Sequence, residues 1–67
     1  MLTNNQIEKG IKALDKFVTE MKEQFPNDKD IESKLFYYLE GARLVLTEID
    51  GDENYIDGLI DSLIHKL

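Results

Sequence analysis

Four oxygen-bearing side chains lie at the spacing of a calcium-binding loop. Asp50, Asp52, Asn54 and Asp61 occupy positions 1, 3, 5 and 12 of a twelve-residue EF-hand loop, and Ca²⁺ prefers such clustered oxygen ligands. The sixth position of that loop requires glycine for its sharp turn, but here it is Tyr55. This departure favours the interpretation in which the acids cap a helix and complement its dipole. We therefore predict no metal site.

His65 is the only histidine, and the chain has no cysteine. A catalytic site needs a base held close to a nucleophile, and His65 has no candidate nucleophile at a recognisable spacing. The four glycines are scattered singly instead of forming a phosphate-binding loop, and the Glu-x-x-His pairs of a di-iron bundle are absent. We therefore predict a protein that is not an enzyme, with no catalytic residues and no cofactor.

The segment from Ile31 to Ile49 is too apolar for an ordinary surface helix. Its main stripe repeats at steps of four and three residues, as expected for one side of a helix, and consists of Ile31, Leu35, Tyr38, Ala42, Val45 and Ile49. Leu39 and Leu46 widen the stripe on one flank, whereas Tyr37 and Leu44 fall on nearly the opposite side. Such a helix needs cover on two faces.

A first helix over residues 4–25 is predicted from a second apolar stripe, formed by Ile7, Ile11, Leu14, Val18, Met21 and Phe25. Thr3, Asn4 or Asn5 can cap its beginning, and Pro26 ends it. Gly10 costs about 1 kcal/mol relative to alanine inside a helix. We therefore expect another helix to approach Gly10 closely.

The predicted fold is all-α, with three helices in one domain over residues 1–67. The helix over 4–25 and the helix over 29–49 are joined by a short turn and form a long antiparallel hairpin. Gly51 ends the second helix, and a short helix over 54–66 must dock on the hairpin because it is marginal alone. Its apolar side is formed by Ile56, Leu59, Ile60, Leu63, Ile64 and Leu67.

The length of 67 residues also bears on oligomeric state. The core of so small a domain rarely supplies more than roughly 3–5 kcal/mol without disulfides, metals or self-association. Because the first two are not expected here, the sequence favours a homodimer in which helices form a bundle. The alternative is a compact three-helix monomer in which the third helix covers Tyr37, Gly41 and Leu44.

The net charge of −6 is concentrated near the C-terminus. Acids and bases almost cancel up to Thr47, whereas Lys66 alone opposes the acids beyond it, which are Glu48, Asp50, Asp52, Glu53, Asp57 and Asp61. Binding to nucleic acid relies on Lys and Arg that neutralise phosphates, so this distribution disfavours direct nucleic-acid binding. A protein partner with a basic surface is the expected alternative.

Candidate partner-binding residues are the apolar side chains Phe36, Tyr37 and Leu44 together with these six acids, since exposed aromatic residues are common at binding hot spots. The main hypothesis is a small acidic regulator or inhibitor that binds a protein target, similar in size and composition to those that bacteria and their phages encode. One alternative is a holding chaperone or assembly adaptor for an amphipathic client. A further alternative is a nucleic-acid mimic that blocks a DNA-binding site.

The start of the chain carries no basic segment followed by an apolar run, and no stretch approaches the roughly 20 apolar residues of a membrane span. We therefore expect a soluble, cytoplasmic protein that does not bind membranes. The chain starts with a methionine and has no obvious tag, so we also expect a complete small gene product.

Overall fold

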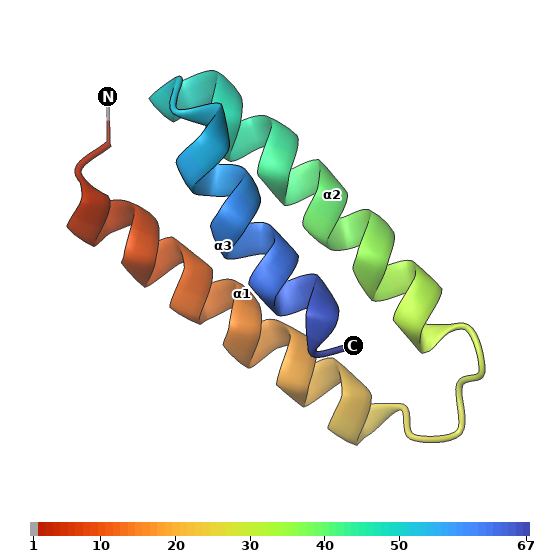
Figure 1. The fold of residues 1–67 in the computed structure, drawn as a ribbon. Helices are drawn as coiled ribbons and strands as arrows, with labels where there is room; N and C mark the ends of the chain where they lie inside the picture. The colour runs from red at the N-terminus through yellow and green to blue at the C-terminus, as the bar shows by residue number, and fades with distance from the viewer. Residues whose placement is uncertain (1) are drawn as a thin grey trace.

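The structure is a computed structural model that describes residues 2–67. It contains three helices, α1 (Asn4–Gln24), α2 (Ile31–Asp50) and α3 (Glu53–His65), and no strand in that range (Figure 1). The predicted all-α fold with three helices is confirmed. None of these helices combines the length and the apolar content needed to cross a membrane.

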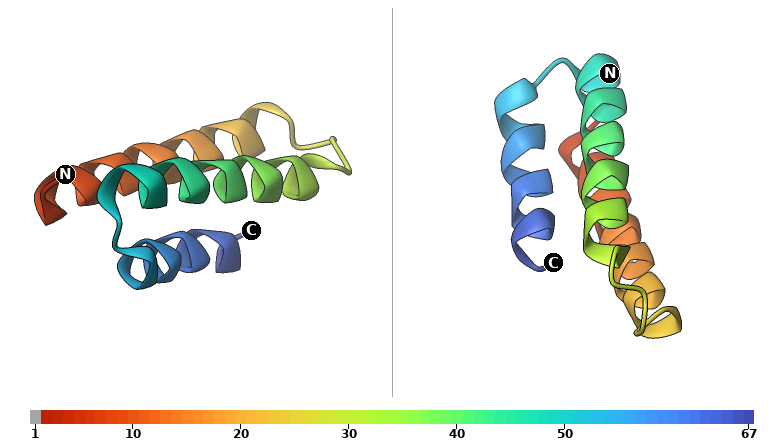
Figure 2. Two further views of the ribbon diagram at one scale, coloured as in Figure 1. Left: turned by 90° about the horizontal axis from the view of Figure 1, so that it is seen from above. Right: turned by 90° about the vertical axis from the view of Figure 1, so that its right-hand side faces the viewer.

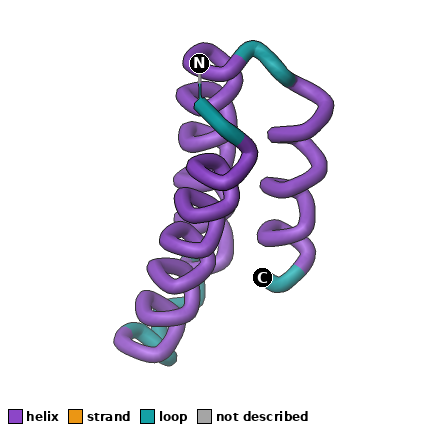
Figure 3. Tube along the Cα trace, turned by 90° about the vertical axis from the view of Figure 1, so that its left-hand side faces the viewer, coloured by secondary structure: helices purple, strands orange, loops and turns teal. Residues whose placement is uncertain are grey.

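The helices α1 and α2 lie side by side in opposite directions, and α3 lies against one face of this pair (Figures 1 and 2). The tube in Figure 3 shows the same arrangement from another side, with α3 separate from the layer that α1 and α2 form. The opposite face of the α1–α2 layer carries no third helix. We call it the open face.

Local side-chain contacts explain where α1 begins and ends. Thr3 is the N-cap: its Oγ1 accepts from the N–H of Gln6 at 3.1 Å, and Gln6 Oε1 accepts from the N–H of Thr3 at 2.8 Å. This reciprocal capping box selects Thr3 from the three predicted caps. At the other end, the N–H of Phe25 donates to the carbonyl of Met21, and Pro26 follows.

Asp28 organises the turn between α1 and α2. Its carboxylate accepts from the N–H of Asp30 at 2.9 Å and from Lys34 Nζ at 2.8 Å, so it joins the turn to the first turns of α2. Asp30 occupies the N-cap position of α2, but its own side chain makes no capping hydrogen bond. The helix begins at Ile31, later than the residue 29 predicted from the sequence.

The junction of α2 and α3 is short because one residue adopts a left-handed conformation. Gly51 has a φ of 82°, and its N–H donates to the carbonyl of Thr47 at 2.7 Å. Glycine takes this conformation without the steric cost that a Cβ brings. Asp52 then caps α3 by accepting from the N–H of Tyr55 at 3.2 Å.

The core lies where the three helices meet. Its fully or almost fully buried side chains are Ile7, Val18, Leu35, Leu39, Ile56, Ile60 and Leu63. All three helices contribute to this set, so α3 completes the core instead of packing on a finished two-helix unit.

The side of α2 that was predicted to be buried differs from the side that is buried in the structure. Leu39, assigned to the flank, is completely buried, whereas Tyr38, Val45 and Ile49 from the main stripe are 44%, 58% and 53% exposed. The reason is that α2 packs against both α1 and α3, and Leu39 belongs to the buried cluster that all three helices share. Phe25, assigned to the stripe of the first helix, is likewise 47% exposed because it lies beyond the end of α1.

Candidate protein-binding face

An apolar groove runs between α1 and α2. The residues that line it are Gly10, Leu14, Tyr38, Gly41, Ala42, Val45 and Leu46, and none of them belongs to α3. No charged side chain contributes to this lining. The groove can therefore contact another apolar surface, and the Tyr38 hydroxyl is the one side-chain polar group in its lining.

Two aromatic rings from different helices stack beside this groove. The ring centroids of Phe17 in α1 and Tyr38 in α2 are 4.6 Å apart, with an interplanar angle of 27°. Both side chains remain more than one third exposed. The stacked pair connects the helices on the open face and leaves aromatic surface available to a partner.

Among residues 2–67, the predicted contact residues Tyr37 and Leu44 are the most exposed large apolar side chains, at 73% and 63%. Helix α3 does not pack on them, so the alternative in which it covers Tyr37, Gly41 and Leu44 is wrong. Phe36 is 40% exposed, and its ring contacts the ring of Tyr37 edge to face at a centroid distance of 5.6 Å. The three predicted apolar contact residues are thus all accessible.

The glycines of the groove have no packing reason within the chain. A Cβ at Gly10 or at Gly41 would meet no atom within 4 Å, so the expectation that another helix approaches Gly10 closely is not met in this structure. Each glycine nevertheless weakens its helix by about 1 kcal/mol relative to alanine. Gly58 on α3 is equally free of neighbours, although it lies away from the groove.

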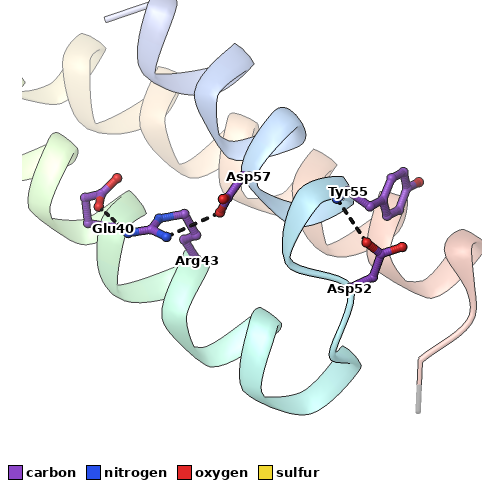
Figure 4. Close-up of polar contacts among 5 residues, drawn as sticks. All are labelled: Glu40, Arg43, Asp52, Tyr55 and Asp57. Carbon is purple, nitrogen blue, oxygen red and sulfur yellow. Dashed lines mark hydrogen bonds and ion pairs between the residues drawn. The ribbon is translucent and has the colours of Figure 1, made fainter.

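The six predicted acids do not form one free patch. Asp52 caps α3, and Asp57 accepts from Arg43 of α2 at 3.3 Å (Figure 4). Arg43 also donates to Glu40 at 2.8 Å. The Glu40 carboxylate has the largest effect on the pKa of the Arg43 guanidinium, and together with the Asp57 carboxylate it raises this pKa. Asp52 and Asp57 thus serve the fold, which reduces the number of acids free for a partner.

The remaining acids are distributed over α2 and α3. Glu48, Glu53 and Asp61 are exposed, and Asp50 is partly buried at the end of α2. Within residues 2–67, no three His, Asp or Glu side chains come close enough together to hold a metal ion. The spacing of the EF-hand loop in the sequence therefore does not produce a ligand cluster.

Tyr55 is a contact between helices that the sequence analysis did not single out. Its hydroxyl lies 3.5 Å from Glu8 Oε1, at the limit of a hydrogen bond between α3 and α1. Desolvation and the neighbouring Glu8 carboxylate raise the pKa of the Tyr55 phenol. Two further polar contacts join α1 to the C-terminal end: Lys66 to Asp15 at 3.2 Å, and Lys22 to the carbonyl of Leu67 at 3.2 Å.

The groove itself was also missed by sequence analysis. Tyr38, Ala42 and Val45 were assigned to the core because they fit the helical period, and periodicity alone cannot distinguish a core stripe from an exposed one. The sequence did contain one signal for an exposed apolar surface, because α2 carries more apolar residues than α1 and α3 together cover.

Comparisons with known proteins give no further assignment. No protein-family model matches the chain, and neither the curated proteins nor the solved structures contain a match to it.

Proposed function

We propose that this chain is a small, non-enzymatic protein-binding regulator whose contact surface is the open face together with Tyr37 and Leu44. The apolar groove between α1 and α2 is the observation that carries the proposal. Around it, large apolar side chains are exposed on both helices. Monomeric proteins rarely expose broad contiguous apolar patches, and such patches commonly mark contacts with other proteins.

The character of this face supports a protein partner with an apolar surface of its own. Tyrosine is frequent at binding hot spots because its large ring gives contact area at a low cost in conformational entropy. Tyr37 and Tyr38 are both exposed here. The exposed acids Glu53 and Asp61 would mainly affect the rate at which a basic partner is met.

A second candidate is a holding chaperone or adaptor for amphipathic helices. The groove favours it, because a client helix could lay its apolar side between α1 and α2. The two candidates differ in selectivity, since a regulator binds one target and a holding chaperone binds many unrelated clients. Nucleic-acid mimicry receives less support, because Asp52 and Asp57 are engaged within the fold.

Affinity capture with matched variants tests the proposal. The wild-type protein is compared with a Tyr37→Lys/Leu44→Lys variant and with Ser62→Lys, which adds a lysine to an exposed position of α3. Helicity is first checked by circular dichroism. We expect the wild type and Ser62→Lys to retain the same single protein, and the double variant to lose it.

Two other outcomes are informative. Equal capture by all three proteins would place the contact elsewhere on the surface and contradict the proposal. Retention of many unrelated proteins through Tyr37 and Leu44 would favour the holding chaperone over the regulator.

A further inference from the structure

We propose that a second copy of this chain occupies the α2 part of this contact surface, with the two α2 helices antiparallel and crossing at Gly41. The inference rests on the proposed function only in that it takes this surface as a protein contact. It names the partner for the α2 part and specifies which residues meet.

Lys34, Gly41 and Glu48 form one line along α2. They are spaced seven residues apart, about two turns of helix, so they project from nearly the same side. All three are exposed, and Lys34 Nζ, which donates to Asp28 at 2.8 Å within the chain, has further protons to donate to a partner. Lys34 and Glu48 lie at equal distances of about 10.5 Å from Gly41 along the helix axis, in opposite directions.

This equal spacing makes the line complementary to itself when a second copy runs antiparallel. A two-fold axis beside Gly41 brings each Lys34 to the height of Glu48 of the second copy, so two opposite-charge pairs form. A parallel arrangement in the same register would place lysine against lysine and glutamate against glutamate. The charges on this line therefore favour the antiparallel orientation.

The apolar residues beside the line are arranged for the same pairing. Tyr38 and Val45 lie on its groove side, and Tyr37 and Leu44 lie on its other side. The two-fold axis keeps each side facing its equivalent, so Tyr38 meets Val45 of the second copy and Tyr37 meets Leu44 of the second copy. All four side chains are between 44% and 73% exposed in the single chain and would lose this exposure on pairing.

Gly41 at the crossing point supplies the close approach that this arrangement needs. In the single chain, a Cβ at this position would meet no atom within 4 Å, so glycine is not required for folding. Where two helices cross, a residue without a side chain allows the backbones to come nearer. The second copy thus gives a physical reason for a glycine that otherwise only weakens α2.

The dimensions of the molecule leave room for an interface of ordinary size. The Cα atoms extend over 39 Å along the long axis and 16 to 17 Å across it. One such side has an accessible surface of the same order as the roughly 800 Å² that each partner buries in a standard interface. Pairing on this side leaves α3 outside and brings the apolar groove toward the second copy.

Charge reversal followed by charge exchange tests the inference. The dimer dissociation constant is measured by sedimentation equilibrium for the wild type, Glu48→Lys, Lys34→Glu and the double variant that carries both changes. We expect a dimer for the wild type, a dissociation constant raised at least about tenfold in each single variant, and recovery in the double variant. Recovery is specific to this pairing, because only the antiparallel orientation joins position 34 to position 48.

Matched controls separate pairing from folding. Glu23→Lys makes the same charge change at an exposed position of α1 and should leave the dimer unchanged. Lys34→Glu also removes the contact with Asp28, so Glu48→Lys is the cleaner single variant. Gly41→Ala and Gly58→Ala should both increase helical stability, but only Gly41→Ala should weaken the dimer.

A wild-type protein that stays monomeric over a range of about 1–500 μM would overturn the inference, as would a double variant no tighter than the single variants. If such a monomer still captured a target through Tyr37 and Leu44, the proposed function would stand without this dimer. The second copy would cover Tyr37 and Leu44, so target capture is also measured with the monomeric Glu48→Lys variant. If the dimer formed as described and neither it nor this variant captured a target, the inference would stand and the regulator proposal would fail.

Discussion

The ring of Phe17 stacks on the ring of Tyr38 at a centroid distance of 4.6 Å, on the side of α1 and α2 that α3 does not cover. This contact joins the two long helices outside the three-helix core. It places aromatic surface next to the groove without filling it, since both rings remain partly exposed. The chain therefore has two apolar regions with different roles: a buried core shared with α3, and the open face.

The first prediction separates these two regions by truncation. Leu39 is completely buried, and Leu39→Ala should lower the free energy of unfolding by about 2–5 kcal/mol, through lost burial and the cavity left behind. Because a domain of this size has a total stability of a few kcal/mol, this variant should be largely unfolded. Urea denaturation followed by circular dichroism provides the measurement.

Val45→Ala is the matched comparison, since Val45 follows Leu39 on the same helix but is 58% exposed. In dilute monomer its effect on the free energy of unfolding should be small, within about 0.5 kcal/mol. Similar losses from both variants would mean that Val45 belongs to the core, and the distinction between core and open face would fail.

The second prediction concerns the glycine of α3. Gly58→Ala should raise the free energy of unfolding by about 0.5–1 kcal/mol, because alanine favours the helix and its Cβ meets no atom within 4 Å. Thermal unfolding at low protein concentration measures the change. Gly51→Ala is the contrasting variant: it should be destabilising, because the φ of 82° is unfavourable for a residue with a Cβ. A gain in stability from Gly51→Ala would contradict this account of the α2–α3 junction.

The sequence was sufficient to predict three helices because their signals are local. Apolar spacing, the proline after the first helix and the glycine after the second each act over a few residues. The rotation of α2 was not predictable in the same way. Leu39 and Tyr38 both fit an apolar stripe, and which of them is buried depends on where α3 docks, a contact between segments distant in the sequence.

The candidate site was predicted in part for the same reason. Tyr37 and Leu44 were singled out because they lie opposite the main stripe, and the structure leaves them exposed. The engagement of Asp57 with Arg43 could not be anticipated, since it requires α2 and α3 to be placed relative to each other. A local signal did exist for Asp52, which is one of the acids that the sequence analysis expected to cap a helix.

The third prediction is a pH dependence that arises from Asp28. The hydrogen bond from Lys34 Nζ, followed by that from the N–H of Asp30, lowers the pKa of the Asp28 carboxyl in the folded chain. A lowered folded-state pKa contributes stability above the unfolded pKa of about 3.9, and this contribution is lost as the pH falls through the folded value. The Asp28→Asn variant lacks this contribution to stability, so its urea midpoint should be lower than that of the wild type at pH 6. The difference between the two urea midpoints should narrow as the pH falls below about 4. A constant difference between wild type and Asp28→Asn from pH 6 to pH 2 would show that the contact acts through its geometry alone and not through the charge of Asp28.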